Sequence, residues 1–228
     1  MKLLVSDYDG TFNSDNKNLY INIAAINKFR KNGNKFVIAT GRNFESIKKE
    51  TDIYDIQYDY LICNNGLIIF DNQNNIINYS TLSGEDLNYL YQSLKNNCDV
   101  KNLKLYNFYS STKNLKNILE IYAKFKSAEA SKWYKKYLES VMPNILCYQD
   151  GKDLFISSNE TKASAVCFIQ EKEAIDKDNI YTIGDNKNDL EMLEKFYGYK
   201  MLFSYPNMWF KNIPVTREVH TLVKKISK

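Results

Sequence analysis

Short apolar runs alternate with helix-like stretches at the start of the chain, and this alternation constrains the fold more than any other feature. Residues 2–6, 35–39 and 60–63 have the length and composition of buried strands. Residues 18–32 carry apolar side chains at helical spacing and stop at a glycine, and another helix is expected from about residue 43. Because strands separated by helices pair in parallel, the sequence predicts an α/β sheet.

A segment of different character interrupts this alternation. It follows a hairpin predicted over residues 67–79, with Asp71–Asn75 as the turn. Residues 82–157 are expected to form an inserted α+β domain between two core segments, 1–81 and 158–228. Within the insert, the pattern predicts a helix at 84–97, a strand at 103–109, a long helical region at 114–141, and strands at 145–149 and 154–157.

The strand–helix alternation resumes after the insert. The core is therefore expected to be a Rossmann-like α/β domain built from both ends of the chain. The elements predicted for its second segment are a helix near 163–172, a strand at 180–183, a helix at 189–196, a strand at 200–203 and a terminal helix at 217–226.

The composition argues against several classes of protein. The formal net charge is only +4, and the lysines do not form a basic stripe with interleaved aromatics, so nucleic-acid binding is not expected. No stretch approaches the roughly 18–20 apolar residues of a membrane span, and the N-terminal apolar run is too short for a signal peptide. The four cysteines lack C-x-x-C spacing, which favours reduced thiols and a cytoplasmic location. No sequence feature indicates an oligomeric state.

Polar segments follow three of the predicted strands. In open α/β sheets, ligands bind at the carboxyl ends of the strands, so these segments are expected to meet in one site. They are Asp7-Tyr8-Asp9-Gly10-Thr11 after the first strand, Thr40-Gly41-Arg42 after the second, and Gly184-Asp185-Asn186-Lys187-Asn188-Asp189 after the strand at 180–183.

The residue types in these segments suit phosphoryl transfer. A carboxylate can act as the nucleophile, and Mg²⁺ takes oxygen ligands and neutralises charge on the phosphoryl oxygens. Asp7 and Asp9 can divide nucleophilic attack from proton transfer. Asp185 and Asp189 are spaced to share one helix face toward a cation. Lys162 opens the first helix after the insert and can neutralise phosphate charge.

Each segment also has a simpler interpretation. The pattern D-x-D-G occurs in Ca²⁺ loops, but the glutamate expected at the twelfth position falls on Asn18. Thr40–Arg42 can be a helix entry, Asp189 an acid favoured by a helix dipole, and Lys162 one lysine among many. The ordered presence of all the segments favours function, while a role for Arg42 itself is left open.

Together these residues resemble the four motifs of the haloacid dehalogenase superfamily, namely D-x-D-G-T, a strand-final threonine, a lysine and G-D-x-x-N-D. The Thr-Gly-Arg segment, Asn65-Gly66 after the third strand and the position of the insert resemble the subgroup with a type-IIB cap, the Cof-like sugar-phosphate phosphatases. The resemblance covers about residues 1–79 and 157–203 and fades in the insert.

This resemblance implies a Mg²⁺-dependent phosphatase that forms an aspartyl phosphate on Asp7, with Asp9 as general acid and base. The insert would be the cap that selects a small phosphorylated metabolite, such as a sugar phosphate. The phosphate-binding positions implied are Tyr8, Thr40, Gly41, Lys162 and Asn188. The metal-binding positions implied are Asp7, Asp9 through its main-chain carbonyl, Asp185, Asn186 and Asp189.

The chain departs from the family pattern on the substrate side of the site. Ala163 follows the motif lysine where glycine is frequent, Leu67 follows Asn65-Gly66 where a small residue is usual, and Ser204–Met208 differs from the usual segment after the last core strand. Two other functions stay open. A phosphomutase or phosphotransferase would differ only in the phosphoryl acceptor, whereas a non-catalytic binding module is disfavoured because every motif carboxylate is present.

Overall fold

The computed structural model describes residues 1–82, 84–203 and 210–227, and the chain divides into two compact units. The core unit comprises residues 1–42, 46–78 and 161–228, and the insert unit comprises residues 43–45 and 79–160. Both ends of the chain therefore belong to the core unit. The expected departure at Ser204–Met208 lies outside the described residues.

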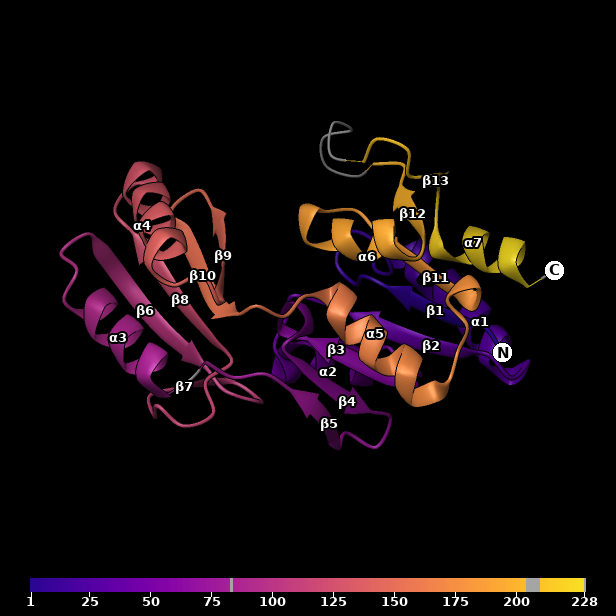
Figure 1. Cartoon of the computed structure of the whole chain (residues 1–228). Coiled ribbons are helices and arrows are strands. Elements are labelled where there is room, and N and C mark those ends of the chain that lie inside the picture. The colour runs from indigo at the N-terminus through magenta and orange to yellow at the C-terminus, as the bar shows by residue number, and fades with distance from the viewer. Residues whose placement is uncertain (83, 204–209, 228) are drawn as a thin grey trace. The chain divides into compact units, whose positions relative to one another are not determined.

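An eight-stranded sheet forms the centre of the core unit, in the order β13-β12-β11-β1-β2-β3-β4-β5 (Figure 1). The six strands from β13 to β3 pair in parallel, and β4 runs antiparallel to β3. The predicted α/β fold is confirmed. The strands are β1 (Leu3–Ser6), β2 (Lys35–Ala39), β3 (Tyr60–Cys63), β4 (Ile68–Asp71), β5 (Ile76–Tyr79), β11 (Ile180–Gly184), β12 (Tyr197–Met201) and β13 (Val215–Thr216).

Helices pack against this sheet and bury their apolar faces on it. Val166 of α5 and Met192 of α6 belong to one buried cluster with Val5 and Val37 of the sheet, and Figure 1 shows both helices on one side of it. α1 packs against α7. The helices are α1 (Asn16–Lys31), α2 (Phe44–Ile53), α5 (Lys162–Glu173), α6 (Leu190–Lys195) and α7 (Val219–Ile226), with 3-10 turns η1 (Asn64–Gly66), η2 (Lys177–Asn179) and η3 (Lys187–Asp189).

The strand register brings the polar segments to one edge of the sheet. Ser6 of β1 lies opposite Ile38 of β2 and Ile183 of β11. Because these strands run in the same direction, the segments that follow them leave the sheet together. Asp7 continues the alignment, since its main-chain N–H donates to the Ile183 carbonyl at 2.9 Å.

The insert unit is an antiparallel sheet with helices on its apolar face. The strand order is β7-β6-β8-β10-β9. Leu90 of α3 and Leu138 of α4 pack in one core cluster with Ile121 and Ile156 of the sheet. Its elements are α3 (Gly84–Lys95), β6 (Val100–Tyr106), β7 (Ser111–Thr112), β8 (Glu120–Phe125), α4 (Ala128–Val141), β9 (Ile145–Asp150) and β10 (Asp153–Ser158).

The long helix predicted over residues 114–141 is wrong in its first half. Residues 120–125 form β8, which pairs with β6 on one side and β10 on the other. Ile121, Ala123 and Phe125 are fully buried at a spacing of two, which is the period of a strand and not of a helix. The helix begins only at Ala128, because the Ser127 side chain accepts from the Ala130 N–H as an N-cap.

Smaller differences occur near the C-terminus. The strand predicted at 200–203 is β12 (Tyr197–Met201), and the helix predicted at 189–196 is split between η3 and α6. The two-residue strand β13 was not predicted, because its segment is too short to show a period. Within the described residues, no helix combines the length and apolar character needed to cross a membrane.

Candidate active site

The carboxyl ends of β1, β2 and β11 surround a cavity of about 260 Å³ in the core unit. Three segments that are far apart in the sequence therefore form one site, as their positions after parallel strands predict. Seven of the site residues implied by the family resemblance line this cavity together with Arg42; the complete lining is Asp7, Asp9, Thr40, Gly41, Arg42, Asp185, Asn186 and Asn188.

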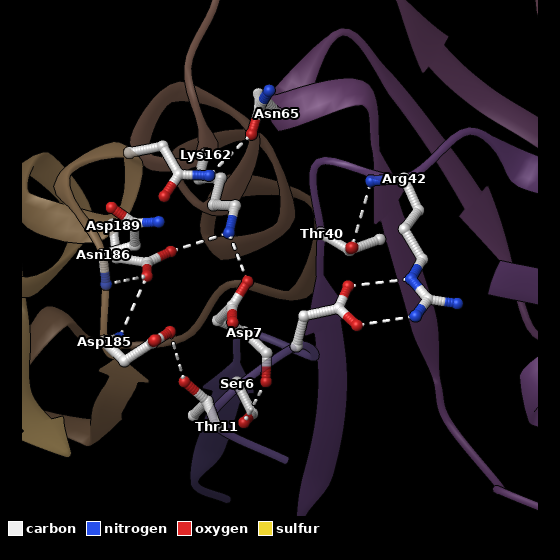
Figure 2. A network of polar contacts seen from close by, with 12 residues as sticks. Ser6, Asp7, Thr11, Thr40, Arg42, Asn65, Lys162, Asp185, Asn186 and Asp189 are labelled. Atoms are coloured by element: carbon white, nitrogen blue, oxygen red, sulfur yellow. Dashed lines mark hydrogen bonds and ion pairs between the residues drawn. The ribbon is translucent and has the colours of Figure 1, made fainter. Parts of the chain in front are cut away.

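Two further predicted residues lie buried beside the cavity. Lys162 Nζ donates to Asp7 Oδ1 at 2.6 Å and to Asp189 Oδ1 at 2.7 Å (Figure 2). The Lys162 side chain is 1% exposed and the Asp189 side chain is fully buried. Burial by itself lowers the pKa of Lys162, but the two carboxylates outweigh this effect and raise the pKa above its ordinary value. The ammonium is therefore a fixed positive charge beside Asp7.

The position of Lys162 depends on close packing between η1 and α5. α5 begins with a capping box in which Thr161 and Ser164 each accept from the other's main-chain N–H. Gly66 approaches this helix end so closely that a Cβ on it would lie 2.1 Å from the Thr161 carbonyl oxygen, and its φ is +113°. Glycine at position 66 therefore lets the loop after β3 contact the helix that carries Lys162.

Asp7, Asp185 and Asp189 form a cluster in which ligand atoms of the three carboxylates all lie within 4.8 Å of one another. Burial raises the pKa of Asp7 well above its ordinary value, Lys162 opposes this, and the Asp189 and Asp185 carboxylates add to it. Burial, followed by the charge of Asp189, also raises the pKa of Asp185. Three carboxylates with one ammonium leave excess negative charge, so this oxygen-only donor set fits a hard divalent cation such as Mg²⁺.

Neighbouring groups fix the orientation of these carboxylates. Thr11 Oγ1 donates to Asp185 Oδ1 at 3.0 Å. Asp189 Oδ2 accepts from the main-chain N–H groups of Asp185 and Asn186 at 3.1 and 3.0 Å. Gly10, at φ +77°, leaves room for Asp185, because a Cβ there would lie 2.6 Å from Asp185 Oδ2. Asp189 thus acts as the internal anchor of the loop after β11.

Asn186 and Asn188 occupy different positions in that loop. The Asn186 side chain accepts from the Lys187 N–H at 2.7 Å and caps η3. Asn188 Nδ2 donates to Asn65 Oδ1 at 2.8 Å, while Asn188 Oδ1 is buried and has no hydrogen-bond partner among the described residues. Asn65 lies in the left-handed region at φ +57°, which asparagine tolerates better than most residues. The Asn65–Asn188 bond was not predicted, since no local pattern relates the two loops.

The segment after β2 presents Thr40, Gly41 and Arg42 to the cavity. Thr40 is buried, and its Oγ1 accepts from the Arg42 main-chain N–H at 3.1 Å. The Arg42 guanidinium binds the Asp9 carboxylate, with Nε donating to Oδ2 at 2.8 Å and Nη2 to Oδ1 at 2.6 Å. Asp9 therefore lies in the predicted site, but its carboxylate is paired with Arg42, a contact that the sequence did not indicate.

Tyr8 differs from the other implied phosphate-binding residues. Its side chain is fully buried, and its hydroxyl donates to Glu50 Oε2 at 3.1 Å. Burial, followed by the negative charge of Glu50, raises the pKa of Tyr8. Because the Tyr8 hydroxyl is hydrogen-bonded to Glu50, Tyr8 would bind phosphate through its main-chain N–H and not through its side chain.

A larger cavity of about 560 Å³ lies beside β12, between the Leu193–Tyr199 segment and residues 211–214. The described residues that line it include no cluster of carboxylates. Residues 204–209 lie outside the described part of the chain. The candidate active site is therefore the smaller cavity at the strand ends, which contains the carboxylate cluster.

Comparisons with known proteins identify the family and the fold of this chain. A family model described as haloacid dehalogenase-like hydrolase matches residues 4–154 and 99–204. A protein of Mycoplasma capricolum subsp. capricolum, itself uncharacterized, is 29% identical over 239 residues, covering 86% of this chain and 88% of its own length.

Two solved structures illustrate the shared fold. A haloacid dehalogenase-like hydrolase from Bacteroides thetaiotaomicron has a TM-score of 0.82 at 16% identity, with 99% of each chain covered. The sucrose-phosphatase from Synechocystis sp. PCC6803, solved with sucrose and phosphate, has a TM-score of 0.73 at 16% identity, covering 99% of this chain and 96% of that one.

The core unit is an α/β domain with a carboxylate-lined cavity at the ends of its parallel strands. The chain belongs to the family of haloacid dehalogenase-like hydrolases, because the family model matches well over half of its length. The superfamily expected from the sequence motifs is thereby confirmed.

Proposed function

We propose that this protein hydrolyses phosphate monoesters of small phosphorylated metabolites through an aspartyl phosphate formed on Asp7. One observation carries the proposal: Asp7 is bound by the buried Lys162 and lies in a carboxylate cluster at the wall of a cavity. A nucleophilic carboxylate, a fixed cation and a divalent-cation site are the parts that phosphoryl transfer needs.

The proposed reaction has two steps. An Asp7 carboxylate oxygen attacks phosphorus in line, the ester P–O bond breaks, and Asp9 donates a proton to the leaving oxygen. Asp9 then takes a proton from water, whose oxygen attacks the aspartyl phosphate and releases inorganic phosphate and the Asp7 carboxylate. Thr40, the Gly41 amide, the Tyr8 amide, Lys162 and Asn188 are proposed to hold the phosphoryl oxygens.

Mg²⁺ is the proposed cofactor. Asp7, the Asp9 main-chain carbonyl, Asp185 and Asn186 would supply its ligands, and Asp189 would orient them through its bonds to the Asp185 and Asn186 main chain. When bound, Mg²⁺ would neutralise charge that develops on the phosphoryl oxygens.

The substrate class proposed is a small phosphorylated metabolite, with sugar phosphates as the first candidates. The sucrose-phosphatase of similar fold was solved with sucrose and phosphate, which supports this choice. The insert unit is proposed to select among such substrates, because loops and inserted elements commonly carry specificity while a rigid scaffold carries the chemistry.

The test is hydrolysis of an activated aryl phosphate with Mg²⁺, with a chelator and in the Asp7→Asn variant, followed by a screen of phosphorylated metabolites. We expect turnover only with metal and with Asp7 intact. A wild-type protein without activity toward any ester would refute the proposal. Release of inorganic phosphate, as opposed to transfer of label to an added sugar, separates hydrolysis from phosphomutase chemistry.

A further inference from the structure

Arg42 holds the Asp9 side chain in a defined direction at the cavity. The guanidinium makes two parallel hydrogen bonds to the Asp9 carboxylate, drawn as paired dashed lines beside Arg42 in Figure 2. The Asp9 side chain is 55% exposed, whereas that of Arg42 is 28% exposed. The more buried partner is therefore the cation, and the more exposed partner is the carboxylate that would act on the leaving group.

Arg42 is also fixed by groups other than Asp9. Its Nη1 lies 3.4 Å from Glu50 Oε1, and its guanidinium carbon lies 5.2 Å from the centre of the Tyr8 ring. The Tyr8 hydroxyl in turn donates to Glu50. The Arg42 carbonyl accepts from the Asn64 N–H at 2.9 Å. The guanidinium therefore has supports besides Asp9, and these remain when the pair with Asp9 opens.

The charges around the cavity give Arg42 a second possible partner. Among the described residues that line the cavity, three are aspartates and Arg42 is the one cation. Lys162 is almost fully buried and is already bound to Asp7 and Asp189. The partly exposed guanidinium of Arg42 would therefore be the positive charge that a phosphate ester meets on entering the cavity. The two parallel N–H groups that match a carboxylate also match two phosphate oxygens.

We propose that Arg42 exchanges partners when substrate binds. Its guanidinium leaves the Asp9 carboxylate and takes two oxygens of the phosphoryl group, and Asp9 is thereby freed to turn toward the leaving oxygen. Arg42 is then a substrate-binding residue and a positioning residue for Asp9. No covalent bond changes in this exchange, since one ion pair replaces another. The inference rests on the proposed phosphatase function and extends it.

Competition between Asp9 and phosphate for Arg42 can be measured directly. The probe is inorganic phosphate, titrated calorimetrically into the Mg²⁺-loaded protein. Arg42→Lys should weaken phosphate binding about 10- to 100-fold, because a paired charge-assisted contact is lost. Asp9→Asn should instead tighten phosphate binding by about 10-fold, because Arg42 no longer has to leave a carboxylate. This tightening should disappear in the Arg42→Lys, Asp9→Asn double variant.

A matched control is present in the same unit. Arg30 binds Asp59 through the same two-bond geometry, at 2.8 and 3.0 Å, and does not line the cavity. Arg30→Lys should leave phosphate affinity unchanged. Its melting temperature shows how much stability is lost when such an ion pair is broken away from the cavity. Melting curves identify variants that fail to fold. If Arg42→Lys does not fold, the phosphate titration of Asp9→Asn is the test. Unchanged or weaker phosphate binding in Asp9→Asn would contradict the proposed exchange.

Three outcomes would overturn the inference while leaving the proposed function intact. Wild-type phosphate affinity in Arg42→Lys would show that Arg42 does not bind phosphate. Unchanged or weaker phosphate binding in Asp9→Asn would show that the Asp9 carboxylate and phosphate do not compete for Arg42. If Asp9→Asn tightens phosphate binding equally in the wild type and in Arg42→Lys, the cause is the loss of a negative charge near the cavity and not the release of Arg42. By contrast, a wild-type protein that hydrolyses no phosphate ester would remove the proposed function itself, whatever the phosphate titrations show.

Discussion

Lys162 Nζ lies 2.6 Å from Asp7 Oδ1, although 155 positions separate the two residues in the chain. The same ammonium contacts Asp189, so two buried carboxylates share one cation. Loss of one partner from a buried ion pair leaves an uncompensated charge, which costs more than the pair itself contributes. This arrangement predicts that Lys162 contributes to stability and, under the proposed function, to reactivity.

Lys162→Met should therefore lower the free energy of unfolding of the core unit by about 3–5 kcal/mol and abolish turnover. Lys35→Met is the matched control, because Lys35 forms an ion pair with Glu173 in which both side chains are partly exposed. That control should cost no more than about 1 kcal/mol. Denaturant unfolding of both variants makes the measurement, and equal losses in the two would contradict the assigned role of Lys162.

Asp185→Asn should weaken Mg²⁺ binding about 10- to 100-fold, because a neutral amide replaces one carboxylate of the cluster. The Mg²⁺-induced rise in melting temperature is the readout, since it depends on metal affinity and not on turnover. Asp178→Asn, at an exposed position in η2, should behave as wild type. A wild-type response to Mg²⁺ in Asp185→Asn would exclude Asp185 as a ligand.

The two aspartates of the first motif should fail in different ways. Asp7→Asn removes the nucleophilic oxygen, so neither phosphoenzyme nor turnover is expected. Asp9→Asn keeps the nucleophile and removes the proton shuttle, whose contribution is typically about 10²–10⁴-fold. Alkyl phosphates should therefore lose far more rate than aryl phosphates, whose leaving groups depart unprotonated. Labelled phosphoenzyme trapped in Asp7→Asn, or equal losses on both ester types in Asp9→Asn, would disprove the division of roles.

The buried Glu120 side chain should make the stability of the insert unit depend on pH. Burial in β8 raises its pKa to about 8, so the folded state binds the proton more tightly than the unfolded state does. Its contribution to stability is present below the unfolded pKa of about 4.3 and is lost as the pH rises toward 8, by about 1.4 kcal/mol per pH unit. Glu120→Gln should remove this slope. Glu139→Gln, exposed on α4, should retain it. Denaturant unfolding between pH 5 and pH 8 tests the prediction, and parallel curves for wild type and Glu120→Gln would refute it.

Local sequence patterns predicted most elements of the core unit because each strand and helix there has a clear period and clear end signals. The buried run at residues 35–39 and the helix that ends before Gly33 were found in this way. The same reasoning failed at residues 114–125, where Leu119 and Ile121 fit either period until pairing with β6 and β10 is known. Non-local hydrogen bonds decide such segments, and a local window does not contain them.

The sequence was sufficient to predict that the three strand-end motifs lie together, because segments that follow parallel strands meet at one edge of the sheet. Asp7, Thr40 and Asp185 were placed in one site on that basis. The partners of the site residues depended on the tertiary structure: Asp9 pairs with Arg42 across 33 positions, and Asn188 with Asn65 across 123. Such contacts arise from loop conformations and packing between elements, and the sequence period along either element carries no information about them.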